Sequence, residues 1–194
     1  MDWFPLILSI KVATISAVLA ALIGIPVGRL MSRKNFYGKD AVEALMLLPL
    51  VLPPSVVGFV LLMLLGKNGP IGSFLSSLGI NIIFTPTAAV IAATIVALPL
   101  MYQNAKGAFS QVDTNLESAA RTLGAGELKV FGTITLPLAL PGLMAGFVLA
   151  FTRGLGEFGA TMMVAGNIPG KTQTIPLAIY FAVDAGQYSN AAKL

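Results

Sequence analysis

The sequence contains no cysteine and no histidine, and only 10% of its 194 residues are charged. The missing cysteines exclude disulfides and thiolate metal sites, and the missing histidines remove the commonest metal ligand and the usual imidazole base. A soluble domain carries about 25% charged residues, so this chain has too little charge for a surface that faces water. The basic residues are scattered rather than gathered in one stripe, which argues against nucleic-acid binding.

What the sequence has instead is apolar length, with 56% hydrophobic residues and a mean hydropathy of +0.87. A helix needs about 20 apolar residues to cross a bilayer, and four runs meet that length: 6–28, 44–66, 86–106 and 130–152. A further run, 172–183, is too short to cross. The last residues resemble the start of another helix, so we expect a final spanning segment to be missing from this chain. The composition predicts an all-α polytopic membrane protein with one transmembrane domain, 1–194.

The basic residues are distributed unevenly between the two sets of connecting loops. One set holds seven of them and the other holds Lys67 and Lys171; the seven are Arg29, Arg33, Lys34, Lys39, Lys106, Arg121 and Lys129. Lys and Arg concentrate on cytoplasmic loops. The sequence therefore predicts a multi-pass protein with its N-terminus outside the cell and the loop 106–135 inside.

The stretch "AGNIPGKT", residues 165–172, has the spacing of a phosphate-binding loop. Such a loop needs a buried strand before it and a helix N-terminus after it. Here a spanning segment precedes it, Pro169 and Pro176 restrict the turn, and the predicted topology places it outside the cell, away from ATP. We interpret the match as chance spacing in a Gly/Pro turn.

The longest polar stretch is 106–137, in the predicted cytoplasmic loop. Thr114 and Glu117 have the spacing of a capping box, which predicts a helix that starts at Thr114. Apolar residues then recur on one helix face, at Leu116, Ala119, Ala120 and Leu123, and Gly124 suits a left-handed C-terminal cap. A second short helix is predicted at 127–133. The apolar stripe has two interpretations, packing on the chain's own helix ends or docking into a groove of another protein.

A resemblance favours docking. "ESAARTLGAGELKVFGTITLP", residues 117–137, resembles the cytoplasmic signature of ABC-importer permeases, in which Glu-Ala-Ala precedes Gly and then Ile-x-Leu-Pro at fixed spacings. Ser118 stands at the glutamate position of that signature, with Glu117 one residue earlier. The resemblance implies that this loop couples the permease to a separate ATPase subunit through residues Glu117, Ser118, Ala119, Ala120, Leu123, Gly124 and Ala125.

The stretch 153–180, "RGLGEFGATMMVAGNIPGKTQTIPLAIY", looks like the molybdate/tungstate-type permeases, relatives of the sulfate type. The resemblance implies a type I permease fold in a prokaryotic inner membrane. It also implies a homodimeric pore, two cytoplasmic ATPase subunits that carry ATP and Mg, and an extracytoplasmic oxyanion-binding protein. No cofactor and no catalysis are expected in this chain. The sequence leaves molybdate, tungstate and sulfate or thiosulfate open as cargo.

Two charges near the end of the fourth run, Arg153 and Glu157, are spaced as i and i+4. They are read either as a pair neutralised on one helix surface or as a guide for the anion, with Thr161 one turn beyond as a further path or gate residue. An ion-coupled secondary transporter would need acids or histidines near the bilayer centre, and an intramembrane enzyme would need a nucleophile with a base or a metal. The sequence offers neither.

Overall fold

The computed structural model describes residues 3–194, and all regular structure within that range is helical. In chain order the elements are α1 (Phe4–Arg33), α2 (Lys39–Val51), α3 (Pro54–Leu65), α4 (Pro70–Ser77), α5 (Pro86–Ser110), α6 (Thr114–Thr122), α7 (Glu127–Val130), the π-helical turn η1 (Phe131–Thr135), α8 (Leu136–Leu155), α9 (Gly159–Ala165), α10 (Ile175–Asp184) and α11 (Tyr188–Ala191).

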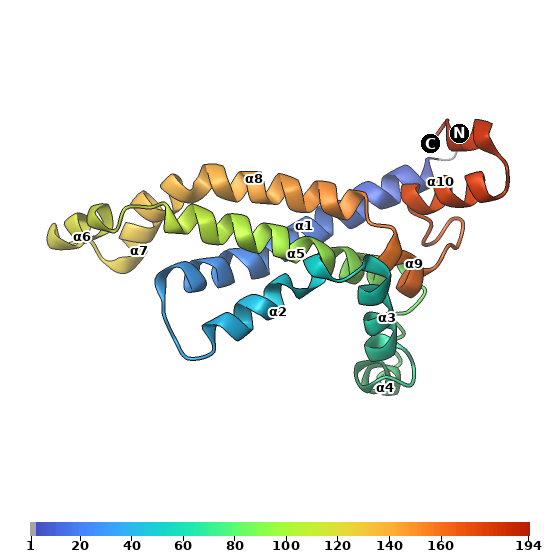
Figure 1. Ribbon diagram of the computed structural model, residues 1–194, viewed down its shortest axis with the longest axis horizontal. Coiled ribbons are helices and arrows are strands. Elements are labelled where there is room, and N and C mark those ends of the chain that lie inside the picture. The colour runs from blue at the N-terminus through green and yellow to red at the C-terminus, as the bar shows by residue number, and fades with distance from the viewer. Residues whose placement is uncertain (1–2) are drawn as a thin grey trace.

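Three long helices, α1, α5 and α8, pack side by side and set the long axis of the molecule (Figure 1). The shortest of the three apolar segments, α5, has 25 residues. At about 1.5 Å per residue it reaches about 38 Å, which exceeds the roughly 30 Å of a bilayer's hydrocarbon core. By length and composition, three of the four predicted spanning segments are confirmed.

The remaining predicted span, 44–66, is not one continuous helix. It is divided into α2 and α3, which are bent by 113° at the break between them. Pro53 and Pro54 explain the break, because neither can donate the backbone hydrogen bond that would continue α2, and Leu52 before them is held in an extended conformation. The pair can act as one broken span or as a re-entrant segment.

Small residues allow the three long helices to approach closely. The face of α5 that packs into the core carries fully buried alanines at positions 88, 89, 92, 93, 97 and 105. A Cβ added at Gly28 of α1 would lie 2.8 Å from both Ala105 Cβ and Lys106 N, and one at Gly146 of α8 would lie 2.7 Å from Asn104 Cβ. Backbones this close gain dispersion contacts that larger side chains would prevent.

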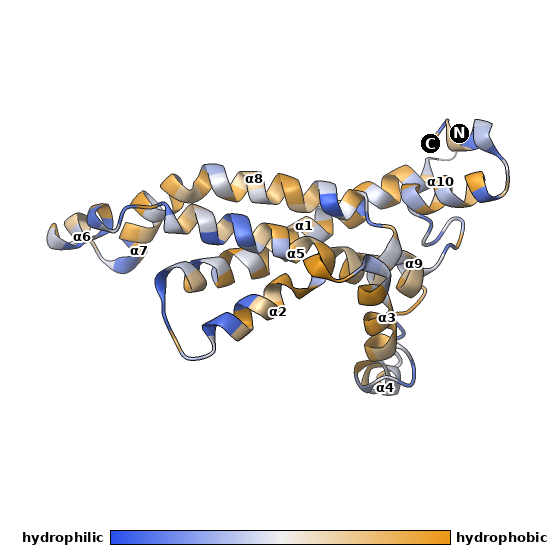
Figure 2. Ribbon diagram, in the orientation of Figure 1, coloured by the Kyte–Doolittle hydropathy of each residue, from blue (hydrophilic) through white to orange (hydrophobic). Residues whose placement is uncertain are grey.

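The two ends of the bundle differ in character. α6 and α7 form one end, and both chain termini lie with α10 at the other (Figure 1). Hydrophilic residues gather mainly at these ends and in the connections, as Figure 2 shows. The run 172–183 corresponds to α10, whose ten residues are too few to cross a bilayer, as predicted. The predicted helix 127–133 is wrong in its end: α7 continues through η1 into α8 without a break.

Candidate functional site

The start of α6 differs from the predicted capping box. Asp113, not Thr114, is the N-cap residue, and its carboxylate accepts a hydrogen bond from the backbone N–H of Asn115 at 2.8 Å. An aspartate at this position satisfies one free N–H and places negative charge at the positive end of the helix dipole. Asp113 therefore caps the helix in place of Thr114, and the Glu117 carboxylate takes no part in the cap.

The end of α6 is as predicted. Gly124 follows the C-cap with φ +85°, in the left-handed region that glycine adopts without steric cost. The N–H of Gly124 donates to the carbonyl of Arg121 at 2.9 Å, and the N–H of Ala125 donates to the carbonyl of Ala120 at 3.0 Å. This pair of bonds is a Schellman motif, and it ends the helix sharply after Leu123.

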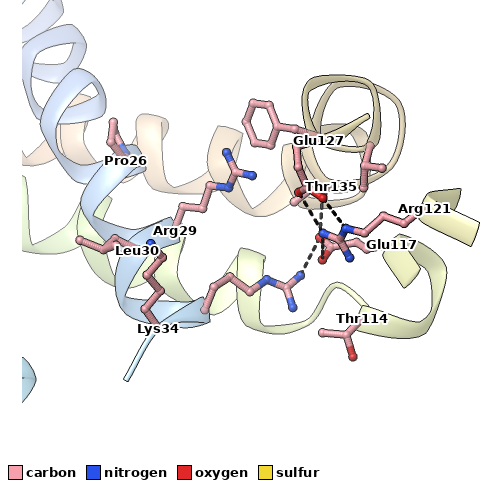
Figure 3. Close-up of a pocket in the computed structure, with 12 residues that line it drawn as sticks. Pro26, Arg29, Leu30, Lys34, Thr114, Glu117, Arg121, Glu127 and Thr135 are labelled. Carbon is pink, nitrogen blue, oxygen red and sulfur yellow. Dashed lines mark hydrogen bonds and ion pairs between the residues drawn. The ribbon is translucent and has the colours of Figure 1, made fainter. Parts of the chain in front are cut away.

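Glu117 faces the interior of the bundle's end and joins three elements. Its carboxylate accepts hydrogen bonds from the Arg33 guanidinium of α1 at 3.0 Å and from the Thr135 hydroxyl of η1 at 2.7 Å (Figure 3). Arg121 lies 3.8 Å from the other carboxylate oxygen. Only 10% of the Glu117 side chain is exposed, whereas 23% of Arg33 is. A buried carboxylate held by two donors fixes α6 against both α1 and the start of α8.

The apolar stripe of α6 faces outward. Leu123 is 88% exposed, Leu116 is 49% exposed, and Ala119 lies exposed between them. Leu128, in α7, adds a second outward leucine at 90% exposure. Of the two interpretations of this stripe, packing on the chain's own helix ends is wrong. The side that packs inward is the side of Glu117, and the leucines face away from the rest of the chain.

α6 is also fastened to α7. The Arg121 guanidinium binds both oxygens of Glu127, at 2.6 and 3.1 Å. This hydrogen-bonded pair lowers the pKa of Glu127 below the usual glutamate range, and the nearby charges of Arg121 and Arg29 act in the same direction. A two-pronged contact of this kind fixes the direction of both side chains, although its exposure limits its contribution to stability.

The turn that follows, η1, is π-helical over Phe131–Thr135. π-helical turns are rare overall and are frequent at functional sites. Here the turn places Phe131 beneath the Arg29 guanidinium of α1, whose carbon lies 3.9 Å from the ring centre, and it aims Thr135 at Glu117. The sequence around Thr135 does not predict its contact with Glu117, because the same pattern occurs in an ordinary amphipathic helix.

Arg153 and Glu157 form the predicted i, i+4 ion pair, at 2.7 Å. Glu157 is 2% exposed and also accepts a hydrogen bond from the N–H of Ala160 at 2.7 Å, which anchors the start of α9. Thr161, in α9, is 1% exposed. The paired, structural interpretation of the two charges fits this arrangement, whereas the role of Arg153, Glu157 and Thr161 in an anion path stays a prediction.

The "AGNIPGKT" stretch forms the irregular loop between α9 and α10. The hydroxyl of Thr172 accepts a hydrogen bond from the N–H of Ile168 and donates one to the carbonyl of Gly166, both at 3.1 Å. A helix, not a strand, precedes the loop, and its threonine is used to close the loop on itself. A phosphate-binding loop requires a strand before it. In the described part of the chain a helix stands at that place, as the sequence predicted.

Residues 5–192 match the family described as the inner membrane component of binding-protein-dependent transport systems. The chain belongs to this family. It is 47% identical over 195 residues to the molybdenum transport system permease protein ModB of Escherichia coli (strain K12), with 100% of this chain and 85% of that protein covered. The identity to ModB of Haemophilus influenzae is 47% over 189 residues, which cover 96% of this chain and 82% of that protein.

Two solved structures share the fold. The MetNI methionine ABC transporter in an inward-facing conformation matches with a TM-score of 0.70 at 19% identity, covering 100% of this chain and 90% of that chain. A bacterial ABC transporter for the import of alginate matches with a TM-score of 0.71 at 18% identity, over 96% of this chain and 71% of that chain. The type I ABC importer permease fold is therefore confirmed. With its apolar helices and its family match, the chain is a multi-pass component of the inner membrane.

Proposed function

We propose that this chain forms the pore of an ATP-driven importer for an oxyanion, molybdate in the first place. Two relatives at 47% identity over nearly the whole chain carry the name of molybdenum transport permease, which supports the cargo. Tungstate shares the shape and charge of molybdate, and sulfate or thiosulfate is the alternative cargo. Two copies of the chain form the pore. An extracytoplasmic binding protein delivers the oxyanion to it, and two ATPase subunits, which bind ATP and Mg, drive transport.

The observation that carries the coupling role is the outward apolar face of α6. Leu116 and Leu123 expose their side chains outside the apolar spans, where nothing in the described chain covers them. Burying a leucine contributes about 1.5–3 kcal/mol, so a protein groove that covers this face gains several kcal/mol from two side chains. The small side chain of Ala119 between them allows a partner backbone to approach closely.

The contacts behind α6 suit the transmission of force. Glu117 connects the helix to Arg33, the last residue of α1, and to Thr135, where η1 passes into α8. A displacement of α6 by an ATPase therefore acts on two spanning helices at once. The Schellman motif at Gly124 and the Arg121 pair keep α6 from unravelling under the same load.

The spanning helices support a weakly binding path. Conduction requires an ion to be bound strongly enough to enter and weakly enough to leave. Charges are scarce along α1, α5 and α8, and Arg153 is already paired with Glu157. We infer that polar groups line the path and that the binding protein supplies the selectivity.

The predicted inner loops carry seven basic residues and the outer loops carry two, which supports an N-terminus outside the cell.

The coupling proposal is tested with Leu123→Glu in the complete transporter, reconstituted in vesicles. We expect ATP-driven uptake to fall at least tenfold. Burial of a leucine side chain raises the association constant with a partner about tenfold or more, and the charge of the glutamate removes that gain. The matched control is Leu78→Glu: Leu78 is also an exposed C-cap leucine, 61% exposed, but at the end of α4. Equal uptake by both variants would refute docking of α6.

Replacing Ala120 by tryptophan should uncouple the two activities, so that ATP hydrolysis continues without transport.

The cargo is tested separately. The binding protein that works with this permease is loaded with labelled molybdate and challenged with unlabelled molybdate, tungstate and sulfate. We expect molybdate and tungstate to displace the label at similar concentrations and sulfate to require far more. Displacement by sulfate at the lowest concentration would replace molybdate by the alternative cargo and would leave the coupling role of α6 untouched.

A further inference from the structure

A continuous surface of α1 changes from apolar to basic along its length. Within the span, a groove of about 290 Å³ lies between α1 and α8; its lining residues are all apolar and are Val18, Ala21, Leu22, Ile25, Pro26 and Phe147. Beyond Pro26 the groove meets a second hollow of about 590 Å³ at the end of the bundle. Pro26 lines both, so the two hollows form one surface.

The second hollow is basic where it adjoins α1. Figure 3 shows Arg29 extending from α1 toward the loop and Lys34 at the end of the same helix. The two carboxylates that line this hollow, Glu117 and Glu127, are already bonded to Arg33 and Arg121. Glu127 still feels the charge of Arg29, but its oxygens bind Arg121. Among residues 3–194, no side-chain hydrogen bond or ion pair engages Arg29 or Lys34, which leaves two cations available.

The contact of Arg29 with Phe131 prepares the guanidinium for an anion. Its carbon lies over the ring, 3.9 Å from the ring centre, and at such a distance a guanidinium favours stacking its flat face on the ring. The five N–H donors of a guanidinium lie in its plane, so stacking leaves them available for a phosphate. The ring also fixes the direction of a side chain that would otherwise lose entropy on binding.

The dimensions fit one leaflet of a bilayer. Val18 and Arg29 are eleven residues apart on one face of α1, which at about 1.5 Å per residue separates them by about 16 Å. Half of a hydrocarbon core of roughly 30 Å is about 15 Å. The apolar groove and the start of the basic hollow together thus run for about the depth of a leaflet, which places the two unpaired cations at the level of the headgroups.

From these observations we infer that this surface binds an anionic phospholipid, with an acyl chain in the groove beside Leu22 and the headgroup phosphate at Arg29 and Lys34. Acyl chains and phosphates occur at these two depths in every bilayer. The inference concerns the membrane alone and does not depend on the cargo, on the ATPase or on which side the N-terminus lies.

The test identifies the occupant directly in the complete transporter. Leu22, which is 66% exposed, is replaced by the photoreactive residue p-benzoylphenylalanine. The complex is reconstituted in vesicles of phosphatidylcholine with a minor fraction of phosphatidylglycerol, irradiated, and the adducts are identified by mass spectrometry. We expect phosphatidylglycerol adducts to exceed its share of the bilayer by about fivefold or more, the attraction that one basic side chain supplies near an anionic membrane surface.

The double variant Arg29→Gln with Lys34→Gln should return the adducts to the bulk lipid ratio. The matched control is Lys11→Gln, which removes an exposed cation from the same helix but far from the groove, and it should preserve the enrichment. An enrichment that survives the double variant would overturn the site. So would a cross-link to a second copy of the chain or to another protein. Adducts at the bulk lipid ratio in the Leu22 variant itself would mean that no anionic lipid is preferred there, and would also overturn the lipid.

Discussion

Glu117→Ala removes the buried carboxylate that joins α6 to α1 and η1. The substitution deletes hydrogen bonds from Arg33 at 3.0 Å and from Thr135 at 2.7 Å. It leaves the hydroxyl of Thr135, a residue only 2% exposed, without its acceptor. Hydrogen bonds to charged groups contribute about 1.5–3 kcal/mol each. Because 23% of the Arg33 side chain reaches solvent, we discount that bond for screening, and expect a total loss of about 2–3 kcal/mol.

The loss is local, so the assay is hydrogen exchange of the α6 amides in the purified transporter. At 1.4 kcal/mol for each factor of ten, the exchange of these amides should become about 30–150 times faster, while exchange in α5 stays unchanged. Glu117→Gln keeps an acceptor for Thr135 and should show a smaller increase. Asp184→Asn is the control, since it removes an exposed acid at the end of α10, away from α6. Unchanged exchange in Glu117→Ala would refute the view that this carboxylate anchors α6.

Three further predictions concern packing, the buried ion pair and pH. Gly28→Ala should lower the thermal stability of the purified protein, because the new methyl would meet α5 at 2.8 Å, whereas Gly132→Ala, with open space around it, should not; equal melting temperatures would contradict the close approach. Arg153→Gln should destabilise the protein by leaving Glu157, whose side chain is 1% exposed, unpaired. Adding Glu157→Gln should restore stability, and if the restored variant still fails in uptake, Arg153 guides the anion as well. The lowered pKa of Glu127 means that its pair stabilises α7 above the usual glutamate pKa and loses that effect only as the pH falls through the lowered value. Acidification from about pH 7 to about pH 4 should therefore leave the protection factors of the α7 amides largely unchanged, once the intrinsic slowing of exchange by acid is divided out. Protection that is already lost at about pH 4 would contradict the shift.

The sequence predicted those features that depend on local composition. The spans that became α1, α5 and α8 follow from uninterrupted apolar length, and the left-handed cap at Gly124 follows from the conformational freedom of glycine. The ion pair between Arg153 and Glu157 followed from their spacing on one helix turn. The resemblance in the coupling loop located the family, because its signature positions keep their spacing.

Features that depend on contacts between distant segments escaped the sequence. Glu117 was assigned to the capping of its own helix, and it instead meets Arg33, which lies 84 positions away in the chain. Hydropathy averages over the break at Leu52 and does not reveal it, whereas the two successive prolines that follow are a readable signal for it. The direction of the α6 stripe could not be decided either, since a helix face toward the protein and one toward a partner have the same periodicity.

The alanine-rich seam of α5 has a mechanical consequence. Where methyl groups are the spacers, α1, α5 and α8 approach too closely to slide past one another or to rotate by a turn without collision. We therefore expect these three helices to move as one stiff body whenever the subunit changes shape. The flexible points must then lie beside that body, at 52–53 between α2 and α3 and at 156–158 between α8 and α9. At both places the series of helical backbone hydrogen bonds is already interrupted.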